Sequence, residues 1–396
     1  MTRPTRVLSL YEGLFAGGAR ILHTSVVRGL HADGSHEHAV LSIASAARRE
    51  STLQRMEDDT RYRELTGAGV AVSTLGRTAG AHPPAPEDYS DAELDAAASV
   101  VADADVILTL KEQPLGLLLA LDERGLLPDV PIASCLHRSD PTHSGAAMRW
   151  LGELGASGRL TSTVSCAQST SDAYARFTPP TVRKIVIPNG IDTARFRPGA
   201  DDRVAVRRAL GIPLDAPVVV FAARFDAMKD PGLFLRSVAS HARRDEQTHY
   251  LMCGAGMTRD NPALTVALAD AGVPLGRVHP LGIRDDMPSV YRAADIVALT
   301  SAYGEASPLC LIEGAATGAT PVTTAVGDAA QIVRGFGVIT PHDEHAIAAA
   351  WAKVISRRPV YRAAALTARP RLGSDRMLDA YRAVIDDLAG VQEAAA

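Results

Sequence analysis

The amino-acid sequence predicts an α/β protein with two doubly wound, parallel-sheet domains of the Rossmann type. Short apolar runs, which indicate buried strands, alternate with helical patterns along the chain, as is typical of parallel sheets covered by helices. With 396 residues, the chain is long for one hydrophobic core and sufficient for two. The turn dipeptide Asn189-Gly190 divides the alternation into two series. We therefore expect domains at 1–190 and 191–374, followed by a helical segment at 375–396.

The first series begins with a strand at residues 7–10 and a helix at 19–30, joined by a glycine-containing loop. The apolar face of that helix comprises Ile21, Leu22, Val26 and Leu30. Further strands are expected at residues 39–43, 70–73, 106–110, 131–136, 160–165 and 184–187, and helices at 91–102 and 114–121. Residues 48–64 carry both charge signs without a wide apolar stripe, which predicts an exposed helix.

The second series repeats the pattern. Its strands are expected at residues 218–222, 249–253, 278–281, 296–300, 321–324 and 337–339. A last helix is expected at 375–388, crossing back to the N-terminal domain, and the tail 389–396 is expected to fray. Two Rossmann-like halves would hold a ligand in a cleft between them.

Composition narrows the class of protein. The formal net charge is −4, so no general basic character favours a nucleic acid partner. The N-terminal residues lack the apolar core of a signal peptide, and no apolar run is long enough to span a membrane. The four cysteines form no metal-binding pair and predict buried thiols in a reducing cytoplasm. The histidines His31, His36 and His38 lack a neighbouring ligand set, so we expect them to be solvated and expect no metal site.

One stretch, residues 295–314, combines a buried strand, a polar loop and a helix. Ser307 is expected to cap the helix and Pro308 to occupy its first position. The first free N–H groups, from about Leu309 and Cys310, would then form an anion site. Two carboxylates flank this site, one before the helix and one about two turns along it. A phosphate ligand with hydroxylated groups on both sides, such as a nucleotide sugar, fits this arrangement.

These carboxylates, Glu305 and Glu313, lie in the pattern Glu305-Ala306-Ser307-Pro308 … Leu311-Ile312-Glu313. It resembles the Glu-x7-Glu segment of retaining glycosyltransferases of the family-4 type, which have the GT-B fold. The segment from Pro188 to Phe196 resembles the one that closes the N-terminal domain in that family. The alternative is two solvated acids on an exposed helix.

The resemblance implies a retaining, metal-independent hexosyltransferase without a cofactor, whose donor is a nucleotide-diphosphate sugar, with a UDP-sugar expected. The resemblance assigns catalytic roles to Glu305, His137, Arg224 and Lys229. It assigns donor binding to Gly17, Gly18, Arg224, Lys229, Gly254, Arg284, Glu305, Ala306, Ser307, Pro308, Leu309 and Glu313. Arg224 and Lys229 would hold the diphosphate, Glu305 the transferred sugar and Glu313 a ribose.

Some matches depart from the family pattern or are weak by themselves. Ala223 and Asp230 replace two glycines beside the expected diphosphate cations, and Arg20 replaces a glutamate after the Gly-Gly pair. Arg284 follows a strand beside which the family places the nucleotide base, but it could equally be an exposed loop residue. His137 follows an apolar strand, where a structural histidine is the alternative to one that faces the donor sugar.

The N-terminal domain is expected to bind the acceptor through strand-end residues, namely Glu12, Lys111, Glu112 and Asp140. The three acids would suit a soluble cationic or polyhydroxylated molecule, such as an aminocyclitol or amino sugar of secondary metabolism. A lipid-linked or cell-envelope glycan is the alternative acceptor, and a solvated turn is the alternative role of these residues. From other classes, a nucleotide-sugar epimerase, a phosphorylase or a non-catalytic sugar-nucleotide-binding module also remains open.

Overall fold

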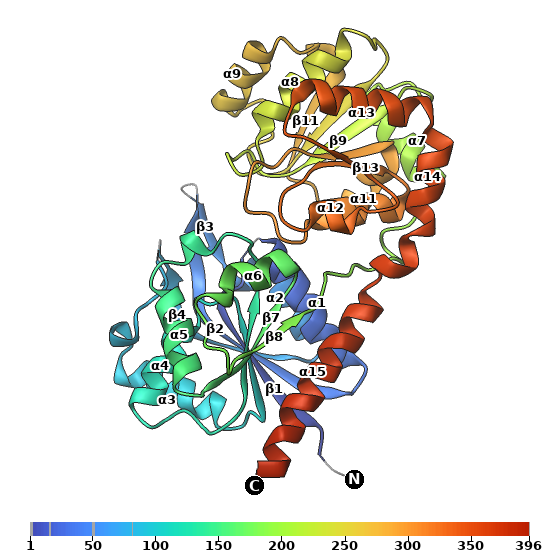
Figure 1. Cartoon of the computed structure of the whole chain (residues 1–396). Coiled ribbons are helices and arrows are strands. Elements are labelled where there is room, and N and C mark those ends of the chain that lie inside the picture. The colour runs from blue at the N-terminus through green and yellow to red at the C-terminus, as the bar shows by residue number, and fades with distance from the viewer. Residues whose placement is uncertain (1–2, 16, 50–51, 81, 396) are drawn as a thin grey trace. The chain divides into compact units, whose positions relative to one another are not determined.

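The computed structural model describes residues 3–15, 17–49, 52–80 and 82–395, which form two compact units (Figure 1). Unit 1 comprises residues 1–188 together with 375–396, and unit 2 comprises residues 189–374. Each unit is built around one sheet whose core strands are parallel. The predicted fold class, two Rossmann-like α/β domains, is therefore confirmed. The sequence had suggested a boundary after residue 190, and unit 1 ends at Pro188.

The sheet of unit 1 has the strand order β3-β2-β1-β5-β6-β7-β8, and β4 also pairs with β2. Its strands are β1 (Thr5–Gly13), β2 (His36–Arg49), β3 (Thr52–Arg55), β4 (Ala71–Ala79), β5 (Val106–Leu110), β6 (Ile132–Leu136), β7 (Leu160–Ser165) and β8 (Arg183–Val186). Its helices are α1 (Gly18–Ala32), η1 (Met56–Asp58), α2 (Thr60–Gly67), η2 (Pro86–Asp88), α3 (Asp91–Val101), α4 (Leu115–Glu123), η3 (Pro141–Ser144), α5 (Ala147–Ala156), α6 (Gln168–Ala175) and α15 (Ser374–Ala395).

Three expectations for unit 1 were wrong. The single exposed helix at 48–64 is instead the end of β2, the antiparallel strand β3, η1 and the start of α2, while residues 50 and 51 lie outside the described residues. Ile21 is 48% exposed, and α1 instead buries the polar side chains of His23 and Thr24 beside Leu22 and Val26. The tail 389–396, which was expected to fray, continues α15 as far as Ala395.

The histidines expected to be solvated lie on or beside β2, and two of them are buried. His36 and His38 are each 2% exposed, and the His36 Nε2 lies 2.9 Å from the Asp386 carboxylate of α15. Arg382 and Asp33 form a second ion pair between α15 and the rest of unit 1, with a distance of 2.6 Å. The last helix therefore belongs to unit 1 through its packing and its charges.

The sheet of unit 2 has the order β11-β10-β9-β12-β13-β14. Its strands are β9 (Val218–Ala222), β10 (His249–Cys253), β11 (Val278–Gly282), β12 (Ile296–Leu299), β13 (Thr320–Thr324) and β14 (Val338–Thr340). Its helices are α7 (Ala200–Ala209), α8 (Pro231–Ala242), α9 (Pro262–Ala271), η4 (Leu275–Arg277), α10 (Met287–Ala293), α11 (Leu309–Thr317), α12 (Ala329–Ile332), α13 (Glu344–Ser356), α14 (Arg358–Thr367) and η5 (Arg369–Leu372).

Alternate residues of β9 belong to different hydrophobic cores. Val218 and Val220 pack with α10, α11 and α14, whereas Val219 and Phe221 pack with α8 and α13. Because side chains alternate between the two faces of a strand, this division places helices on both faces of the sheet. The strand is buried throughout, which explains why its sequence is a continuous apolar run.

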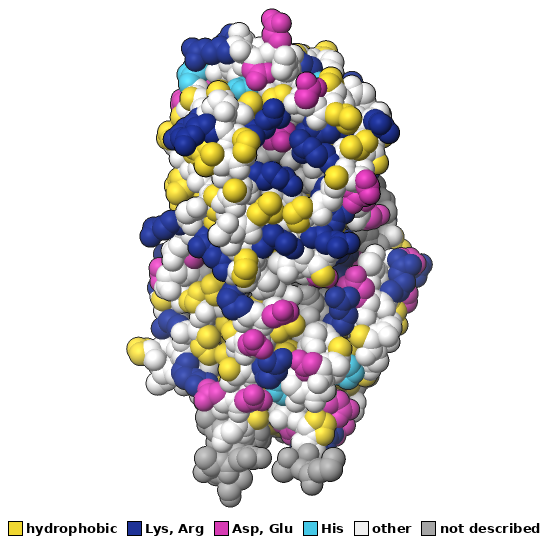
Figure 2. Space-filling model, turned by 90° about the vertical axis from the view of Figure 1, so that its right-hand side faces the viewer, with side chains coloured by type: hydrophobic (Ala, Val, Ile, Leu, Met, Phe, Trp, Pro, Cys, Tyr) yellow, Lys and Arg dark blue, Asp and Glu magenta, His cyan; other side chains and the backbone are white. Residues whose placement is uncertain are grey.

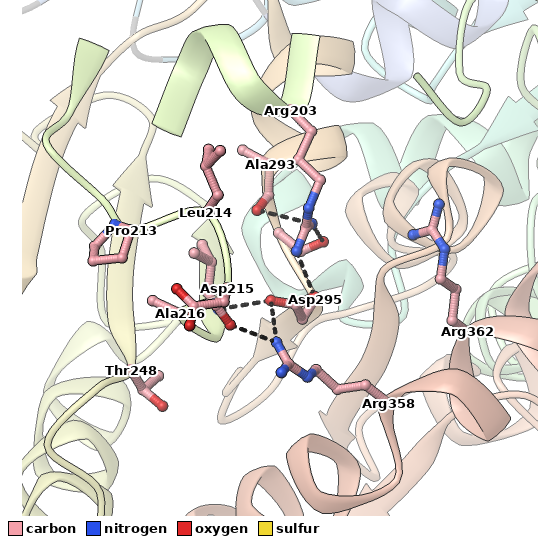
Figure 3. A network of polar contacts seen from close by, with 12 residues as sticks. Arg203, Pro213, Leu214, Asp215, Ala216, Thr248, Ala293, Asp295, Arg358 and Arg362 are labelled. Atoms are coloured by element: carbon pink, nitrogen blue, oxygen red, sulfur yellow. Dashed lines mark hydrogen bonds and ion pairs between the residues drawn. The ribbon is translucent and has the colours of Figure 1, made fainter. Parts of the chain in front are cut away.

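A polar network fixes the amino-terminal ends of β9 and β12, the two central strands. The Asp295 carboxylate accepts hydrogen bonds from the Val218 N–H (2.9 Å), the Arg203 guanidinium (2.9 Å) and the Arg207 guanidinium (3.1 Å). Arg203 and Arg358 approach Asp295 from opposite sides (Figure 3). Arg207 is fully buried and also donates to the carbonyl oxygens of Pro213, Leu214, Ala216 and Ala293. Burial lowers the pKa of Arg207 to about 10.

The last part of unit 2 carries an uneven charge. Residues 345–374 include six basic side chains and no Asp or Glu: Lys353, Arg357, Arg358, Arg362, Arg369 and Arg371. Figure 2 shows basic side chains gathered over the side of unit 2 on which α7 and α14 lie. We call residues 345–374 the acid-free segment.

Candidate functional site

The strand order of unit 2 defines where a ligand site can form. From β9 the chain moves outward through β10 and β11, and then returns to place β12 on the other side of β9. The loops after β9 and β12 therefore diverge at the carboxyl edge of the sheet, which is where open α/β sheets bind ligands. Lys229 lies in the first of these loops and Glu305 in the second.

The structure brings Lys229 and Glu305 into direct contact. The Lys229 Nζ forms an ion pair with the Glu305 Oε1, and the Ser301 Oγ donates a hydrogen bond to the same oxygen at 2.5 Å. Glu305 is 4% exposed and Ser301 is fully buried. The buried carboxylate and the half-buried ammonium compensate each other's charge. Each could also bind part of a ligand, since an ammonium binds phosphate and a carboxylate accepts hydrogen bonds from a hydroxyl.

Hydrogen bonds from side chain and backbone tie the two loops together. The Thr300 hydroxyl donates to the carbonyl oxygens of Lys229 (3.2 Å) and Asp230 (3.0 Å), and the Ala302 N–H donates to the Met228 carbonyl (2.9 Å). The Lys229 main chain is therefore fixed beside the Glu305 loop, and only its flexible side chain is left to move.

Asp230 occupies a left-handed backbone conformation, with a φ of 44°. Asp tolerates this region better than most residues, because its short side chain can bond locally. Its Oδ1 accepts the Leu233 N–H at 2.8 Å and so caps α8, and its Oδ2 lies 3.0 Å from the His342 Nε2. These contacts explain how Asp can stand where the resembled family has glycine.

The helix after Glu305 begins one residue later than expected. Pro308, with extended ψ, is the residue before α11, and Ser307 makes no side-chain cap, because Pro308 itself takes the N-cap place. The Ser307 carbonyl instead accepts a hydrogen bond from the Asn189 side chain at 2.8 Å. The Glu305 carbonyl packs so closely on Gly327 that a Cβ there would lie 1.9 Å from it. The helix ends, as predicted, at Thr317 before a left-handed Gly318.

Glu313 lies in a different environment from Glu305. Its Oε2 accepts a hydrogen bond from the Tyr291 hydroxyl of α10 at 3.0 Å. Burial raises the pKa of Glu313 to about 7, although the Tyr291 hydrogen bond and Arg195 act in the opposite direction. The two motif carboxylates therefore differ: one is compensated by a cation, and the other is held by a neutral phenol.

The remaining predicted donor residues of unit 2 lie on neighbouring strand ends. Arg224 is exposed and pairs with Asp226 on its own loop at 2.8 Å, so it does not join the Lys229–Glu305 contact. Gly254 has a φ of 134°, and a Cβ on it would lie 2.1 Å from the Ala223 carbonyl. This glycine is required by the close approach of the loops after β9 and β10.

Arg284 is exposed and forms a two-point ion pair with Asp286, with distances of 2.7 and 2.6 Å. Both residues line a cavity of about 300 Å³ beside α7 and α10. Its floor is apolar and includes Leu210, Leu281 and Val290. The side chain of Arg284 is thus engaged within its own loop.

At the corresponding edge of unit 1, Glu12 near the end of β1 is already compensated by a cation. Gly17 precedes α1 and Gly18 is its first residue. Arg20, which is 5% exposed, donates to the Gly13 carbonyl at 2.6 Å and to the Glu12 carboxylate at 2.8 Å. Arg20, which departs from the family pattern, thus serves as the partner of Glu12.

The other acids expected to meet the acceptor also have internal partners. Glu112 is 1% exposed and accepts hydrogen bonds from the Ser144 hydroxyl and from the Gln113 side chain (3.0 Å). Asp140 accepts from the Thr142 N–H (3.0 Å) and hydroxyl (2.6 Å) and so caps η3. These contacts turn the carboxylates toward internal donors, of which Arg20 compensates the charge of Glu12.

Lys111 and His137 follow the adjacent strands β5 and β6. Lys111 has a φ of 67°, and its carbonyl accepts the Thr109 hydroxyl at 2.7 Å. Burial, and then the charge of Arg20, lower the pKa of Lys111. The His137 Nε2 is buried and has no hydrogen-bond partner among the described residues. Burial, with a smaller effect of Lys111, lowers the pKa of His137 to about 3, so the imidazole is neutral.

Two contact residues were missed by sequence reasoning. Ser301 directly follows the polar end of the predicted strand and lies four residues before Glu305, so its hydroxyl could have been suspected. Tyr291 lies on the preceding helix, 22 positions before Glu313, and no local pattern reveals their contact.

Within the described ranges, no three His, Cys, Asp or Glu side chains gather as a metal site. The same residues include no helix that combines the length and the apolar character needed to cross a bilayer.

Solved structures of other proteins share this fold. The solved structure of Alr3699/HepE from Anabaena in complex with UDP is 19% identical and superimposes with a TM-score of 0.77, covering 99% of this chain and 100% of that one. Sucrose-phosphate synthase from Thermosynechococcus elongatus is 17% identical, with a TM-score of 0.72 over 98% and 100% of the two chains. At these sequence identities the likeness confirms the predicted fold.

Within unit 2, residues 216–357 match the family model described as glycosyl transferases group 1. D-inositol 3-phosphate glycosyltransferase of Salinispora arenicola is 35% identical over 47% of this chain and 44% of that protein. The Mycobacterium leprae protein of the same name is 33% identical over 52% and 50%. The chain thus spans about half the length of the curated relatives it matches.

Proposed function

We propose that the chain is a retaining glycosyltransferase that moves a hexosyl group from a nucleotide-diphosphate sugar, a UDP-sugar, to a hydroxyl of a soluble polyhydroxylated acceptor. The observation that carries the proposal is the Lys229–Glu305–Ser301 contact at the divergence of the loops after β9 and β12. It combines a cation for phosphate and a carboxylate for a sugar hydroxyl next to the start of α11, whose first N–H groups also favour an anion.

The reaction needs no general base from the protein. The bond between the sugar C1 and the β-phosphate oxygen breaks while the acceptor oxygen bonds to C1 from the same face. The acceptor proton passes to the departing phosphate oxygen. In this proposal Lys229 compensates the charge that grows on the leaving diphosphate, and Glu305 orients the sugar. Glu313 accepts hydrogen bonds from the ribose.

The names of related proteins support the nature of both substrates. Structures of Alr3699/HepE contain UDP, or UDP and glucose, and the relatives in sequence are called D-inositol 3-phosphate glycosyltransferases. A cyclitol is a compact polyol and belongs to the proposed class of acceptors, which includes aminocyclitols. Because the acids of unit 1 have internal partners, neutral polyols are to be tested beside amino-substituted ones.

A thermal-shift panel of UDP-, GDP-, dTDP- and ADP-sugars tests the donor. A ligand that binds only the folded state stabilises it by about 2.7 kcal/mol at a hundred times its Kd. We expect a rise in Tm with UDP and UDP-sugars and none with the other bases. No shift with any nucleotide sugar would contradict the proposal.

Product analysis separates transfer from epimerisation. The protein is incubated with labelled UDP-sugar, with and without a mixture of cyclitols. We expect a labelled glycoside only in the presence of acceptor. Conversion of the donor to an isomeric UDP-sugar without acceptor would identify an epimerase, and binding without conversion would identify a non-catalytic module.

A further inference from the structure

The contact between Lys229 and Glu305 raises a question of charge. Lys229 is the cation that the proposed function assigns to the donor diphosphate, yet here it is the counter-ion of Glu305. An ammonium in contact with a carboxylate offers little net attraction to a phosphate. If the donor draws Lys229 toward its diphosphate, a carboxylate that is 4% exposed loses its counter-ion, which is unfavourable unless another donor holds it.

Ser301 is placed to hold the carboxylate during such an exchange. Its hydroxyl lies 2.5 Å from the Glu305 Oε1, the same oxygen that Lys229 contacts. The residue is fully buried directly after β12, and its carbonyl accepts the Thr324 hydroxyl of β13 at 2.8 Å. Ser301 is therefore anchored to the sheet, unlike the long side chain of Lys229.

The main chain of Lys229 cannot follow its side chain. Its carbonyl is held by the Thr300 hydroxyl at 3.2 Å, and the neighbouring Met228 carbonyl is bonded to the Ala302 N–H at 2.9 Å. An exchange of partners must therefore take place by rotation of the lysine side chain about its single bonds. The serine and the carboxylate remain on the same rigid loop while the lysine moves.

We propose that Ser301 is a positioning residue that keeps Glu305 ionised and oriented when the donor diphosphate takes Lys229 as its partner. This inference rests on the proposed function of the same site. Ser301 touches neither the diphosphate nor the transferred atom and acts through Glu305. Its hydroxyl matters most in the donor-bound state, after the lysine has left, and least in the free protein, where Lys229 shares the carboxylate.

The test compares Ser301→Ala and Ser301→Thr with Ser237→Ala. Ser237 is a matched control, because it is also fully buried in unit 2, and its hydroxyl donates to the Leu233 carbonyl within α8. UDP affinity is measured by calorimetry, and turnover is measured with UDP-glucose between pH 5 and 9. Thermal unfolding of each variant establishes that it is folded.

We expect Ser301→Ala to bind UDP within about twofold of the wild type and to lose about 10- to 100-fold in turnover, the usual effect of removing a hydrogen bond to a charged group. The acidic limb of its pH profile should move to higher pH, because a carboxylate that loses a donor is protonated more easily. Ser301→Thr, which keeps the hydroxyl, should recover most of the turnover and the wild-type pH limb.

Two outcomes would overturn this inference and leave the proposed function standing. In the first, Ser301→Ala turns over as fast as Ser237→Ala. In the second, Ser301→Ala loses UDP affinity and turnover in parallel, and the acidic limb of its pH profile does not move. If Ser301→Ala does not fold, the test depends on Ser301→Thr. A Ser301→Thr variant that is as stable as the wild type but lacks the acidic limb of the wild-type pH profile would contradict the role of the hydroxyl. A wild-type protein that neither binds UDP nor turns over UDP-glucose would overturn the proposed function and this inference together.

Discussion

The carboxyl edges of the two sheets each contain a residue in an unusual backbone conformation. Among the described residues, Lys111 and Asp230 are the two non-glycine residues with positive φ, and they lie on unit 1 and unit 2 respectively. Asp230 gains from its conformation, because it caps α8 and contacts His342. The contacts of the Lys111 main chain, with the hydroxyls of Thr109 and Ser134 and the carbonyl of Cys135, would be available to any side chain. We therefore predict a role for the lysine side chain itself, since strain of this kind collects at functional sites.

The same edges differ in how their acids are compensated. In unit 2, we propose that the Lys229–Glu305 ion pair opens for a ligand that offers both a phosphate and a hydroxyl. In unit 1, Glu12 and Glu112 are fixed by Arg20 and Ser144. From this contrast we predict that unit 2 exchanges partners on binding, whereas unit 1 offers a preformed surface. The following experiments test this contrast.

The largest effect is expected for Lys229→Ala. Removal of a preorganised charge at a leaving group lowers turnover by about 10² or more. Turnover should fall more than UDP affinity, because the leaving-group charge grows in the transition state. Steady-state kinetics with UDP-glucose and calorimetry with UDP measure the two quantities. Full activity of this variant would remove Lys229 from the site, and chelators should leave the wild type unaffected.

Glu305→Ala and Glu313→Ala should separate turnover from nucleotide binding. Glu305→Ala should bind UDP nearly as the wild type does and lose tenfold or more in turnover, about the effect of one hydrogen bond to a charged group. Glu313→Ala should weaken UDP binding directly, since it removes the acceptor for the ribose hydroxyls. Calorimetry measures the UDP affinity of both variants. An equal loss of UDP affinity would refute the assignment of Glu305 to the sugar and Glu313 to the ribose.

The pKa of Glu313 predicts a dependence of stability on pH. Because its pKa is raised from 4.5 to about 7 in the folded protein, the folded state holds this proton more tightly than the unfolded chain. The stabilisation of the folded state by this proton is complete below pH 4.5 and is lost as pH rises to 7. The free energy of unfolding then falls by up to about 1.4 kcal/mol per pH unit. Denaturant titrations of the wild type and Glu313→Gln measure it, with the exposed Glu246→Gln as the control. Parallel profiles for all three proteins would contradict the raised pKa.

The smallest effects concern the two residues with positive φ. Lys111→Gly should raise the free energy of unfolding by about 0.5–1 kcal/mol, because glycine adopts this conformation without strain. It should lower turnover if Lys111 serves a substrate. Asp230→Gly should change stability by less than about 0.5 kcal/mol, because the relief of strain is offset by the lost cap and the lost contact with His342. Urea unfolding measures both, and a destabilised Lys111→Gly would show that the lysine is structural.

The fold could be predicted because its signals are local. The strands β5, β7, β9 and β10 begin and end at the predicted residues. For β5, β9 and β10 the signal is a short, mainly apolar run, whereas β7 is more polar. The short antiparallel strand β3 was missed, because its side chains are polar and its pairing with the end of β2 depends on residues that follow it. His36 was assigned to solvent for a similar reason: its partner Asp386 is 350 positions away.

The site was predictable to the extent that it lies within one strand–loop–helix unit. Glu305 and Glu313 could be recognised from their spacing, and Lys229 from its position after an apolar strand. The direct contact of Lys229 with Glu305 could not be recognised, because the two residues are 76 positions apart. The internal partners of Glu12, Glu112 and Asp140 were hidden as well, since sequence shows that an acid follows a strand but not which donor it meets.

The acid-free segment has a consequence for the behaviour of the protein in an electric field. Unit 1 carries 20 Lys and Arg against 27 Asp and Glu, a net charge of −7, whereas unit 2 carries 21 against 18, a net charge of +3. Without residues 345–374 and their six bases, unit 2 would have 15 against 18, or −3. Its positive charge is therefore concentrated in thirty residues, so unit 2 is a strong electric dipole. An acidic protein with such a dipole should be retained by a cation exchanger at neutral pH and low salt, in one orientation, with α14 toward the resin.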